Sequence, residues 1–469
     1  MIEQKRKSGL LMHISSLYDE YGIGTFGQCA YDFADFLKMA GQSLWQILPL
    51  NPVGRGNSPY SSASAFAIEP LFIDLKLLKE AGFIFETDLA GILLKNGKRV
   101  NYTQVRRIRK TVFAAAYQNF KCNVPADFEV FCSENAFWLN DYAEYMSKTG
   151  EDILYHKMLQ YFAFSQWHAL KKYVNSLGIQ IIGDMPFYVS LNSADVVFHS
   201  ENFLLDENVK PIAVAGCPPD DFSKDGQLWG NPVYNWLQMK KDGYSWWVSR
   251  LSHAQRLFDI IRIDHFRAFE DYYAVPCGEK TAVNGSWHKG PSKDFFKKIK
   301  AQLPDLNIIA EDLGFLTPNV KRLLEYTGYP GMKILQFAFD SRENSDYLPH
   351  NYIKNSVCYT GTHDNDTTLG WIRTADKKDV LYAKEYFGVK TDKGLLHAMI
   401  RGAFASVCDT AVIPAQDILK LGSCARMNTP ATVSSKNWSF RADKNAFTAE
   451  LAEQLSSFSS IYKRNEWIL

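Results

Sequence analysis

The chain has 469 residues, 46% of them hydrophobic, and a formal net charge of +1. This apolar content supports a large buried core and excludes a disordered chain. A near-neutral charge without a long basic run argues against nucleic acid or an anionic membrane as the main partner.

The N-terminal part of the chain alternates between strand and helix patterns. Residues 8–16 predict a first strand, residues 29–40 have helical apolar spacing, and residues 43–54 predict a buried strand. This alternation is typical of a parallel α/β fold. An insertion at about 54–150 follows, in which the mixed-charge helical patterns of 75–150 predict a helical subdomain. A helix over 153–177 then leads into a strand over 178–190 that contains Asp184.

A second insertion covers about 195–250. Its prolines and glycines between 215 and 236 predict a structured loop rather than a helix or a strand. Such a long loop is usually functional, and we interpret it as a lid over the active site. The five remaining strands are predicted at 258–266, 306–313, 332–339, 355–364 and 409–416.

These patterns count eight strands and predict one (β/α)₈ TIM barrel over residues 1–469, with two insertions. The segment beginning NWSFRADKNAF (437–447) is interpreted as the start of a final helix, so no C-terminal β-sandwich domain is expected.

Three of the predicted strands end in a carboxylate. Asp264 ends IIRID, Glu311 follows IIA, and Asp364 lies in YTGTHDND. The carboxyl ends of barrel strands meet at one face, where active sites of this fold lie. Carboxylates flanking a sugar bond can supply an acid and a nucleophile, so the pattern predicts cleavage of a glycosidic bond.

The neighbours of these carboxylates suggest a division of roles. Arg262 lies on the same strand face as Asp264 and would keep it ionised, as a nucleophile requires, although a buried ion pair is the alternative. Asp312 follows Glu311, and adjacent side chains at a strand end point to opposite faces, so only one of the two would enter the site. A nearby like charge would raise the pKa of Glu311, which suits a general acid. The alternative for Glu311 is a helix cap.

The His363–Asp364 pair is interpreted as a ligand of sugar hydroxyls that also enforces ring distortion. A metal site is the alternative, but neither H-E-x-x-H nor Cys₂His₂ spacing occurs. We therefore expect no metal and no organic cofactor. Asp366 in the same segment fits a turn or a helix N-cap.

The order of these residues, with Asp184 on the third strand, resembles the α-amylase clan of glycoside hydrolases and transglycosidases. The loop CPPDDFSKDGQLWGNPVYNW (217–236) is more specific, and it is similar to the 4-alpha-glucanotransferases, or amylomaltases. The segments SPYSSASAFA, IIRIDHFRAF, IIAEDLG, YTGTHDNDTTLGW, IPAQDIL and NWSFR extend the resemblance from residue 8 to 441.

The resemblance implies a role for each matching residue. Asp264 would be the nucleophile of a covalent glycosyl intermediate, Glu311 the acid/base, and Asp364 the carboxylate that grips the donor sugar. The implied substrate-binding residues are Tyr60, Asp220, Gln227, Trp229, Arg262, His265 and His363; Asn231 could instead belong to a turn. Two departures stand out: Phe440 where the family often has Trp, and Asp221 where an aromatic residue is common.

The implied function is retaining transfer of an α-1,4-glucan segment between malto-oligosaccharides, or to glucose. A lid at 215–236 that keeps the site dry would favour transfer over hydrolysis. A hydrolase of the same clan is the first alternative, and a non-catalytic glucan-binding protein is the second. Monomer and homodimer both remain open.

The location of the protein follows from three absences in the sequence. The eight cysteines form no C-x-x-C pair, the charged N-terminal residues contain no apolar signal core, and no run of 18 apolar residues occurs. We therefore expect no membrane span and a cytoplasmic protein.

Overall fold

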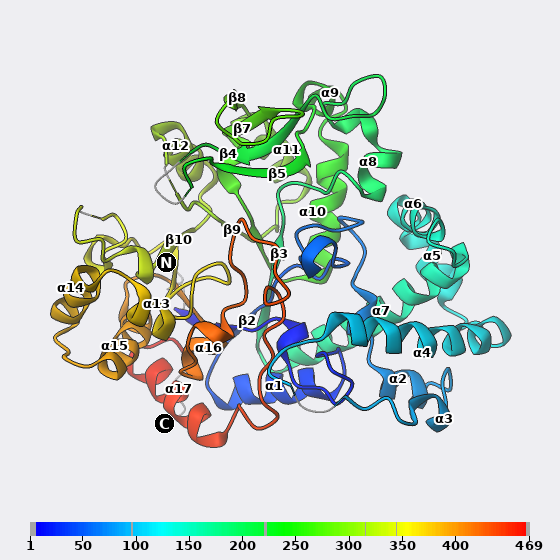
Figure 1. The fold of residues 1–469 in the computed structure, drawn as a ribbon, viewed down its shortest axis with the longest axis horizontal. Helices are drawn as coiled ribbons and strands as arrows, with labels where there is room; N and C mark the ends of the chain where they lie inside the picture. The colour runs from blue at the N-terminus through cyan, green and yellow to red at the C-terminus, as the bar shows by residue number, and fades with distance from the viewer. Residues whose placement is uncertain (1–5, 95–96, 220–222, 315, 344, 466–469) are drawn as a thin grey trace.

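Eight parallel strands form the central sheet of the computed structural model, which describes residues 6–94, 97–219, 223–314, 316–343 and 345–465 (Figure 1). The strands are β1 (Lys7–Leu11), β2 (Leu44–Gln46), β3 (Gln180–Met185), β6 (Ile260–Ile263), β9 (Ile308–Ala310), β10 (Gly331–Ile334), β11 (Ser356–Tyr359) and β12 (Thr410–Pro414). Their spatial order is β10-β11-β12-β1-β2-β3-β6-β9. Ala310 N donates to Pro330 O at 2.9 Å and brings the two ends of this order together, so the sheet is barrel-like, as predicted.

The strands are short and almost entirely buried, as expected where helices cover a parallel sheet. Covering helices include α1 (Gln28–Met39), α7 (Ile153–Ser176), α10 (Ser245–Leu257), α11 (Ser292–Gln302), α12 (Pro318–Thr327), α15 (Asp392–Ala405) and α17 (Ala449–Ile461). The helices α13 (Thr368–Thr374), α14 (Lys377–Phe387) and α16 (Ala415–Ile418) lie near α15. None of the described helices is long and apolar enough to cross a membrane.

The first insertion is helical and lies at one side of the barrel (Figure 1). It contains α2 (Leu75–Glu80), α3 (Glu86–Leu89), α4 (Tyr102–Cys122), α5 (Phe128–Glu134) and α6 (Ala136–Ser147). In α4, Val105, Ile108, Val112 and Ala116 repeat at helical spacing and are buried, which explains why this segment folds as an amphipathic helix. Both α4 and α6 pack against α7.

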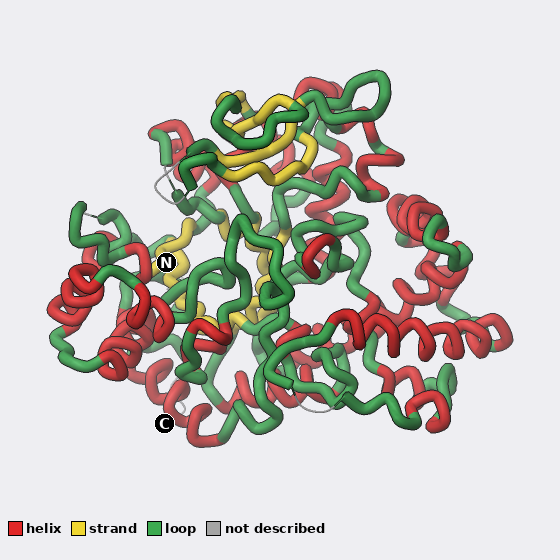
Figure 2. The backbone as a smooth tube through the Cα atoms, in the orientation of Figure 1, coloured by secondary structure: helices red, strands yellow, loops and turns green. Residues whose placement is uncertain are grey.

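The second insertion contributes to an antiparallel sheet that is separate from the barrel (Figure 2). Its strands are β4 (Ala213–Cys217), β5 (Gln227–Pro232), β7 (Asp271–Pro276) and β8 (Ser286–Lys289), in the order β5-β4-β7-β8. The prediction of a loop without strands over 215–236 is therefore wrong. Gly226, at φ 67°, allows the tight turn before β5, and pairing with the distant β7 stabilises β4.

Several strand and helix boundaries also differ from the prediction, and most strands are shorter than predicted; β2, for example, ends at Gln46 and β3 at Met185. The first strand ends at Leu11, and Ile14–Ser16 form a 3₁₀ turn. The final helix begins only at Ala449, with Thr448 as its N-cap, so the NWSFR segment is not helical. The remaining short helices of the second insertion are α8 (Ala194–Phe198) and α9 (Trp236–Lys241).

Candidate active site

Asp264 and Glu311 lie directly after two neighbouring barrel strands. Asp264 N donates to Met185 O, and Glu311 N donates to Ile263 O, both at 3.0 Å. These bonds continue the ladders by one residue and hold both backbones at the carboxyl ends of β6 and β9. Glu311 Oε2 accepts a hydrogen bond from the main-chain N–H of His265. Glu311 is therefore not a helix cap, since α12 begins at Pro318 with Thr317 as its cap.

Arg262 links three carboxylates from the interior of the barrel. Its side chain is 3% exposed, and Nη1 donates to Asp184 Oδ1 at 2.6 Å and to Asp264 Oδ1 at 3.2 Å. Its Nη2 lies 3.9 Å from Glu311 Oε2. The register explains this arrangement, because Arg262 pairs with Asp184 across the β3–β6 ladder. The predicted Arg262–Asp264 pair exists, but the shorter bond goes to Asp184.

Burial and charge raise the pKa of both Asp264 and Glu311. For Asp264, burial raises the pKa, Arg262 opposes it, and the charges of Asp184 and Asp364 add to the rise. For Glu311, burial and then the charge of Asp264 raise the pKa. Since Arg262 is closer to Asp264 than to Glu311, we assign the ionised form to Asp264 and the proton to Glu311.

Asp312 does not play the part predicted for it. Its Oδ1 accepts a hydrogen bond from Met332 N at 2.6 Å, so its carboxylate is engaged with β10. The like charges that raise the pKa of Glu311 are those of Asp264, from the neighbouring strand, and then of Asp364. Glu311 and Asp312 have different partners, as expected for successive side chains that point to opposite faces of a strand.

His363 and Asp364 follow β11 and meet Tyr60 across the barrel mouth. The Tyr60 hydroxyl donates to Asp184 Oδ2 at 2.6 Å and lies 3.0 Å from His363 Nε2. The Tyr60 and His363 rings stack, with centroids 5.4 Å apart and planes at 16°. Asp364 Oδ2 is 3.5 Å from His363 Nε2, and the Asp364 side chain is 43% exposed, so this carboxylate can reach a ligand.

The loop between α16 and α17 supplies residues that the sequence analysis missed. Asn428 Nδ2 donates to Asp364 Oδ1 at 2.6 Å, and Arg426 Nη2 donates to Asp364 O at 2.6 Å. The Trp438 ring lies 5.5 Å from the Tyr60 ring. Trp438 belongs to the NWSFR motif, in which the resemblance pointed to position 440 as the aromatic residue of interest. Phe440 is buried in the core and bridges Arg99, so the aromatic residue at the site is Trp438.

Trp229, on strand β5, contacts His265, the residue that follows Asp264. The Trp229 ring is edge-to-face with His265, with centroids 5.0 Å apart, and its Nε1 donates to Gln227 Oε1 at 3.1 Å. Asn231 Nδ2 donates to Val189 O at 2.7 Å, so it anchors β5 within a strand and does not belong to a turn. Asp220 and Asp221 lie outside the described residues.

His265 has a left-handed backbone, with φ 49°, which is costly for a residue with a side chain. This conformation coincides with the hydrogen bond from its N–H to Glu311. Burial, followed by the charge of Arg267, lowers the pKa of His265 to about 3, so its ring is neutral.

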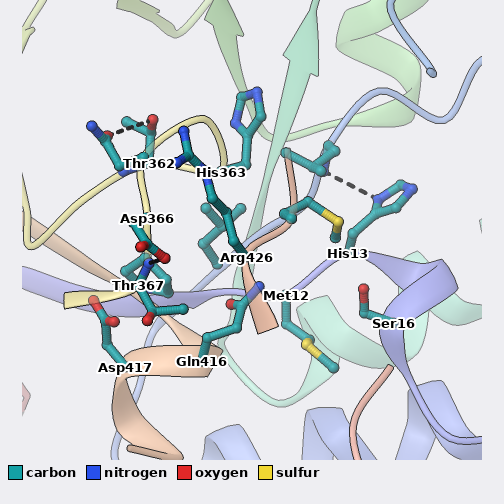
Figure 3. A pocket seen from close by; sticks show the side chains of 15 residues that line it. Met12, His13, Ser16, Thr362, His363, Asp366, Thr367, Gln416, Asp417 and Arg426 are labelled. Carbon is teal, nitrogen blue, oxygen red and sulfur yellow. Dashed lines mark hydrogen bonds between the residues drawn. The ribbon is translucent and has the colours of Figure 1, made fainter. Parts of the chain in front are cut away.

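A pocket with polar and apolar lining residues lies beside His363 (Figure 3). Its lining includes Met12, His13, Ser16, Asp366, Gln416 and Arg426. Asp366 accepts hydrogen bonds from Thr367 N and the Ser423 hydroxyl, whereas the N-cap of α13 is Thr367. In the part of the chain that the structure describes, no group of three His, Cys, Asp or Glu side chains could hold a metal ion.

The chain is similar in sequence to a family of known enzymes. The family described as 4-alpha-glucanotransferase matches residues 12–150 and 144–446. A 4-alpha-glucanotransferase of Clostridium butyricum is 45% identical over 488 residues, covering 97% of this chain and 100% of that protein. A 4-alpha-glucanotransferase of Thermus thermophilus is 40% identical and covers 99% of this chain and 100% of that protein.

Solved structures agree with the sequence comparison. The amylomaltase from Streptococcus agalactiae in complex with acarbose superposes with a TM-score of 0.95 at 39% identity, covering 98% of this chain and 100% of that chain. The amylomaltase from Corynebacterium glutamicum shares the fold, with a TM-score of 0.83 at 19% identity, covering 98% of this chain and 75% of that chain. This chain belongs to the 4-alpha-glucanotransferase family and has 4-alpha-glucanotransferase activity.

Proposed function

We propose that the chain transfers α-1,4-glucan segments by a retaining double displacement with Asp264 as nucleophile and Glu311 as acid/base. The observation that carries this proposal is the sharing of one buried guanidinium by the two carboxylates, 3.2 Å from Asp264 and 3.9 Å from Glu311. The guanidinium favours the ionised form of Asp264, which is the nearer of the two, and the charge of Asp264 favours the protonated form of Glu311. One ionised and one protonated carboxyl are the starting state of a retaining glycosidase.

In the first step, protonated Glu311 gives its proton to the glycosidic oxygen as the bond to C1 breaks. Asp264 attacks C1 and forms a covalent glycosyl ester, and the shortened glucan leaves with a free 4-hydroxyl. In the second step, the Glu311 carboxylate removes the proton from the 4-hydroxyl of an acceptor sugar. That oxygen attacks C1, the ester bond breaks, and Asp264 is again ionised.

We propose that Asp364, His363 and Asn428 bind hydroxyl groups of the donor sugar, while Tyr60 packs on its ring. The partly exposed Asp364 carboxylate, flanked by the Asn428 amide, supports this assignment. The amylomaltase of Streptococcus agalactiae is in complex with acarbose. For this chain we propose malto-oligosaccharides, α-1,4-glucans and glucose as the ligands.

We propose that Trp229, Gln227 and His265 form the acceptor side and favour a sugar over water. The edge-to-face contact between Trp229 and His265 places an aromatic ring beside the residue after the nucleophile. Hydrolysis of the same glycosyl ester is the competing reaction, and the exposure of Asp364 favours it, since water can reach the site.

All eight cysteines are free thiols, which supports a reducing compartment such as the cytoplasm.

Incubation with maltotriose alone tests the proposal. We expect glucose together with a ladder of longer malto-oligosaccharides, and a single Asp264→Asn substitution should abolish both. Glucose and maltose without longer products would establish hydrolysis. Full transfer by Asp264→Asn would refute the assigned nucleophile, because an amide cannot form the glycosyl ester.

A further inference from the structure

Arg426 connects two segments that carry site residues. It lies in the long loop between α16 and α17 and is half-buried. Its Nη2 donates to the main-chain oxygen of Asp364, and its Nε donates to the main-chain oxygen of Asn428, both at 2.6 Å. Figure 3 shows its side chain extending past His363 on the wall of the pocket.

The two segments joined by Arg426 also bind each other. Asn428 N donates to His363 O at 3.1 Å, and Asn428 Nδ2 donates to Asp364 Oδ1 at 2.6 Å. The Asp364 carboxylate is therefore oriented by an amide whose own backbone is held by Arg426. The loop that carries Asn428 has little regular structure, so few helix or strand hydrogen bonds hold that residue in place.

The chemistry of this contact requires arginine. Nε and Nη2 lie on one edge of a rigid planar group, so two carbonyl oxygens bound to that edge are fixed relative to each other. A lysine ammonium offers one flexible point of charge and cannot impose that geometry. Both acceptors are main-chain oxygens, so the guanidinium sets backbone positions and touches no reacting atom.

We propose that Arg426 is a positioning residue of the transfer reaction, setting Asp364 and Asn428 at the spacing that the donor sugar requires in the transition state. This inference rests on the proposed role of Asp364. A displacement of about 1 Å in a positioned group can reduce a rate by about 100-fold. The loss should appear in kcat and in kcat/KM alike, because the affected contact tightens in the transition state.

Arg426→Ala, assayed with maltotriose, tests the inference. We expect kcat to fall by about 10- to 100-fold, in the range given by a displaced contact. Removing the side chain enlarges the pocket beside His363, so added guanidinium, far below unfolding concentrations, should restore at least several-fold of the lost rate. Ammonium at the same ionic strength should not, and Arg426→Lys should remain impaired.

Arg373→Ala is the matched control, since Arg373 is an exposed arginine of α13 in the same region. It should keep wild-type activity and show no response to guanidinium. Near-wild-type kcat for Arg426→Ala, or a loss that guanidinium does not restore, would overturn the inference. If Arg426→Ala does not fold, the kcat of Arg426→Lys tests the inference instead. A near-wild-type kcat for Arg426→Lys would overturn the inference.

Asp264→Asn, measured in parallel, separates this inference from the proposed function. Inactive Asp264→Asn together with active Arg426→Ala would refute only the role of Arg426. Full transfer by Asp264→Asn would refute the proposed mechanism itself.

Discussion

Asp184 offers a direct test of how charge is distributed in the site. Its side chain is fully buried, and its two oxygens accept hydrogen bonds from Arg262 and Tyr60, each at 2.6 Å. Asp184→Asn removes the charge and keeps the shape. The amide oxygen can still accept from Arg262, so the guanidinium stays in place while its positive charge acts more fully on Asp264.

The substitution should shift the acidic limb of the pH profile to lower pH. Asp264 must be ionised to attack, so kcat/KM rises with pH through its pKa and falls through the pKa of Glu311. The charge of Asp184 raises the pKa of Asp264, and removing that charge lowers it. The rise in the pKa of Glu311 comes mainly from burial and from Asp264, so the alkaline limb should move less.

The same substitution should lower stability by a measurable amount. Removing one partner of a buried ion pair costs about 3–5 kcal/mol. Arg262 retains Asp264 at 3.2 Å, so we expect the lower end, about 3 kcal/mol. The unfolding entropy of 469 residues is about 1 kcal/mol/K, so the midpoint of thermal unfolding should fall by about 3 °C.

The assay is kcat/KM for maltotriose against pH, together with thermal unfolding of each variant. Asp195→Asn is the control, because Asp195 is also a buried aspartate but bonds to Ala65 N, away from Arg262. It should lower stability and leave the pH profile unchanged. An acidic limb of Asp184→Asn that stays in place or moves to higher pH would refute the electrostatic reasoning.

Three further substitutions test separate parts of the molecule. Tyr60→Phe removes the hydroxyl between Asp184 and His363 but keeps the ring. Because one hydrogen bond contributes roughly 1.5 kcal/mol, kcat/KM should fall by about 10-fold. An unchanged kcat/KM would exclude a role for that hydroxyl. Trp229→Ala opens the acceptor side, so the ratio of hydrolysis to transfer products from maltotriose should rise. A constant ratio would contradict the interpretation of residues 215–236 as a lid that keeps water out. Arg464 is 1% exposed and donates hydrogen bonds to Phe404 O and Lys7 O at 2.7 and 2.9 Å. Arg464→Ala should lower the free energy of unfolding, measured with a chemical denaturant, by at least about 3 kcal/mol while kcat stays unchanged. A smaller loss would show that water satisfies those carbonyl groups.

Several features of the fold could be predicted from sequence because they depend on local patterns. The short apolar segments that end at Asp264, Glu311 and Asp364 are buried barrel strands followed by carboxylates. The helical spacing at 29–40 and 153–177 agrees with α1 and α7. In each case neighbouring residues in the chain determine the secondary structure. Burial of one face gives a helix a periodic pattern of apolar residues, and burial of both faces gives a strand a continuous apolar run, and both patterns are visible in the sequence.

The antiparallel sheet could not be predicted in the same way. Residues 215–236 contain the glycines and prolines of a loop, and β4 forms because β7, about 60 residues later, pairs with it. Long-range pairing of this kind overrides local preference, since strand formation depends on the partner more than on the strand itself.

The sequence by itself determined which chemical groups the site contains: a carboxylate beside an arginine, a second beside another carboxylate, a third beside a histidine, and an aromatic loop. Only the tertiary structure decided how they are connected. Arg262 bonds most closely to Asp184, and the charges that raise the pKa of Glu311 are those of Asp264 and Asp364 rather than Asp312. Arg426 and Asn428 hold Asp364 from a loop some 60 residues away. The reason is that hydrogen bonds and charge interactions depend on distance in space. The strand register and the path of the loop between α16 and α17 back to the site determine those distances.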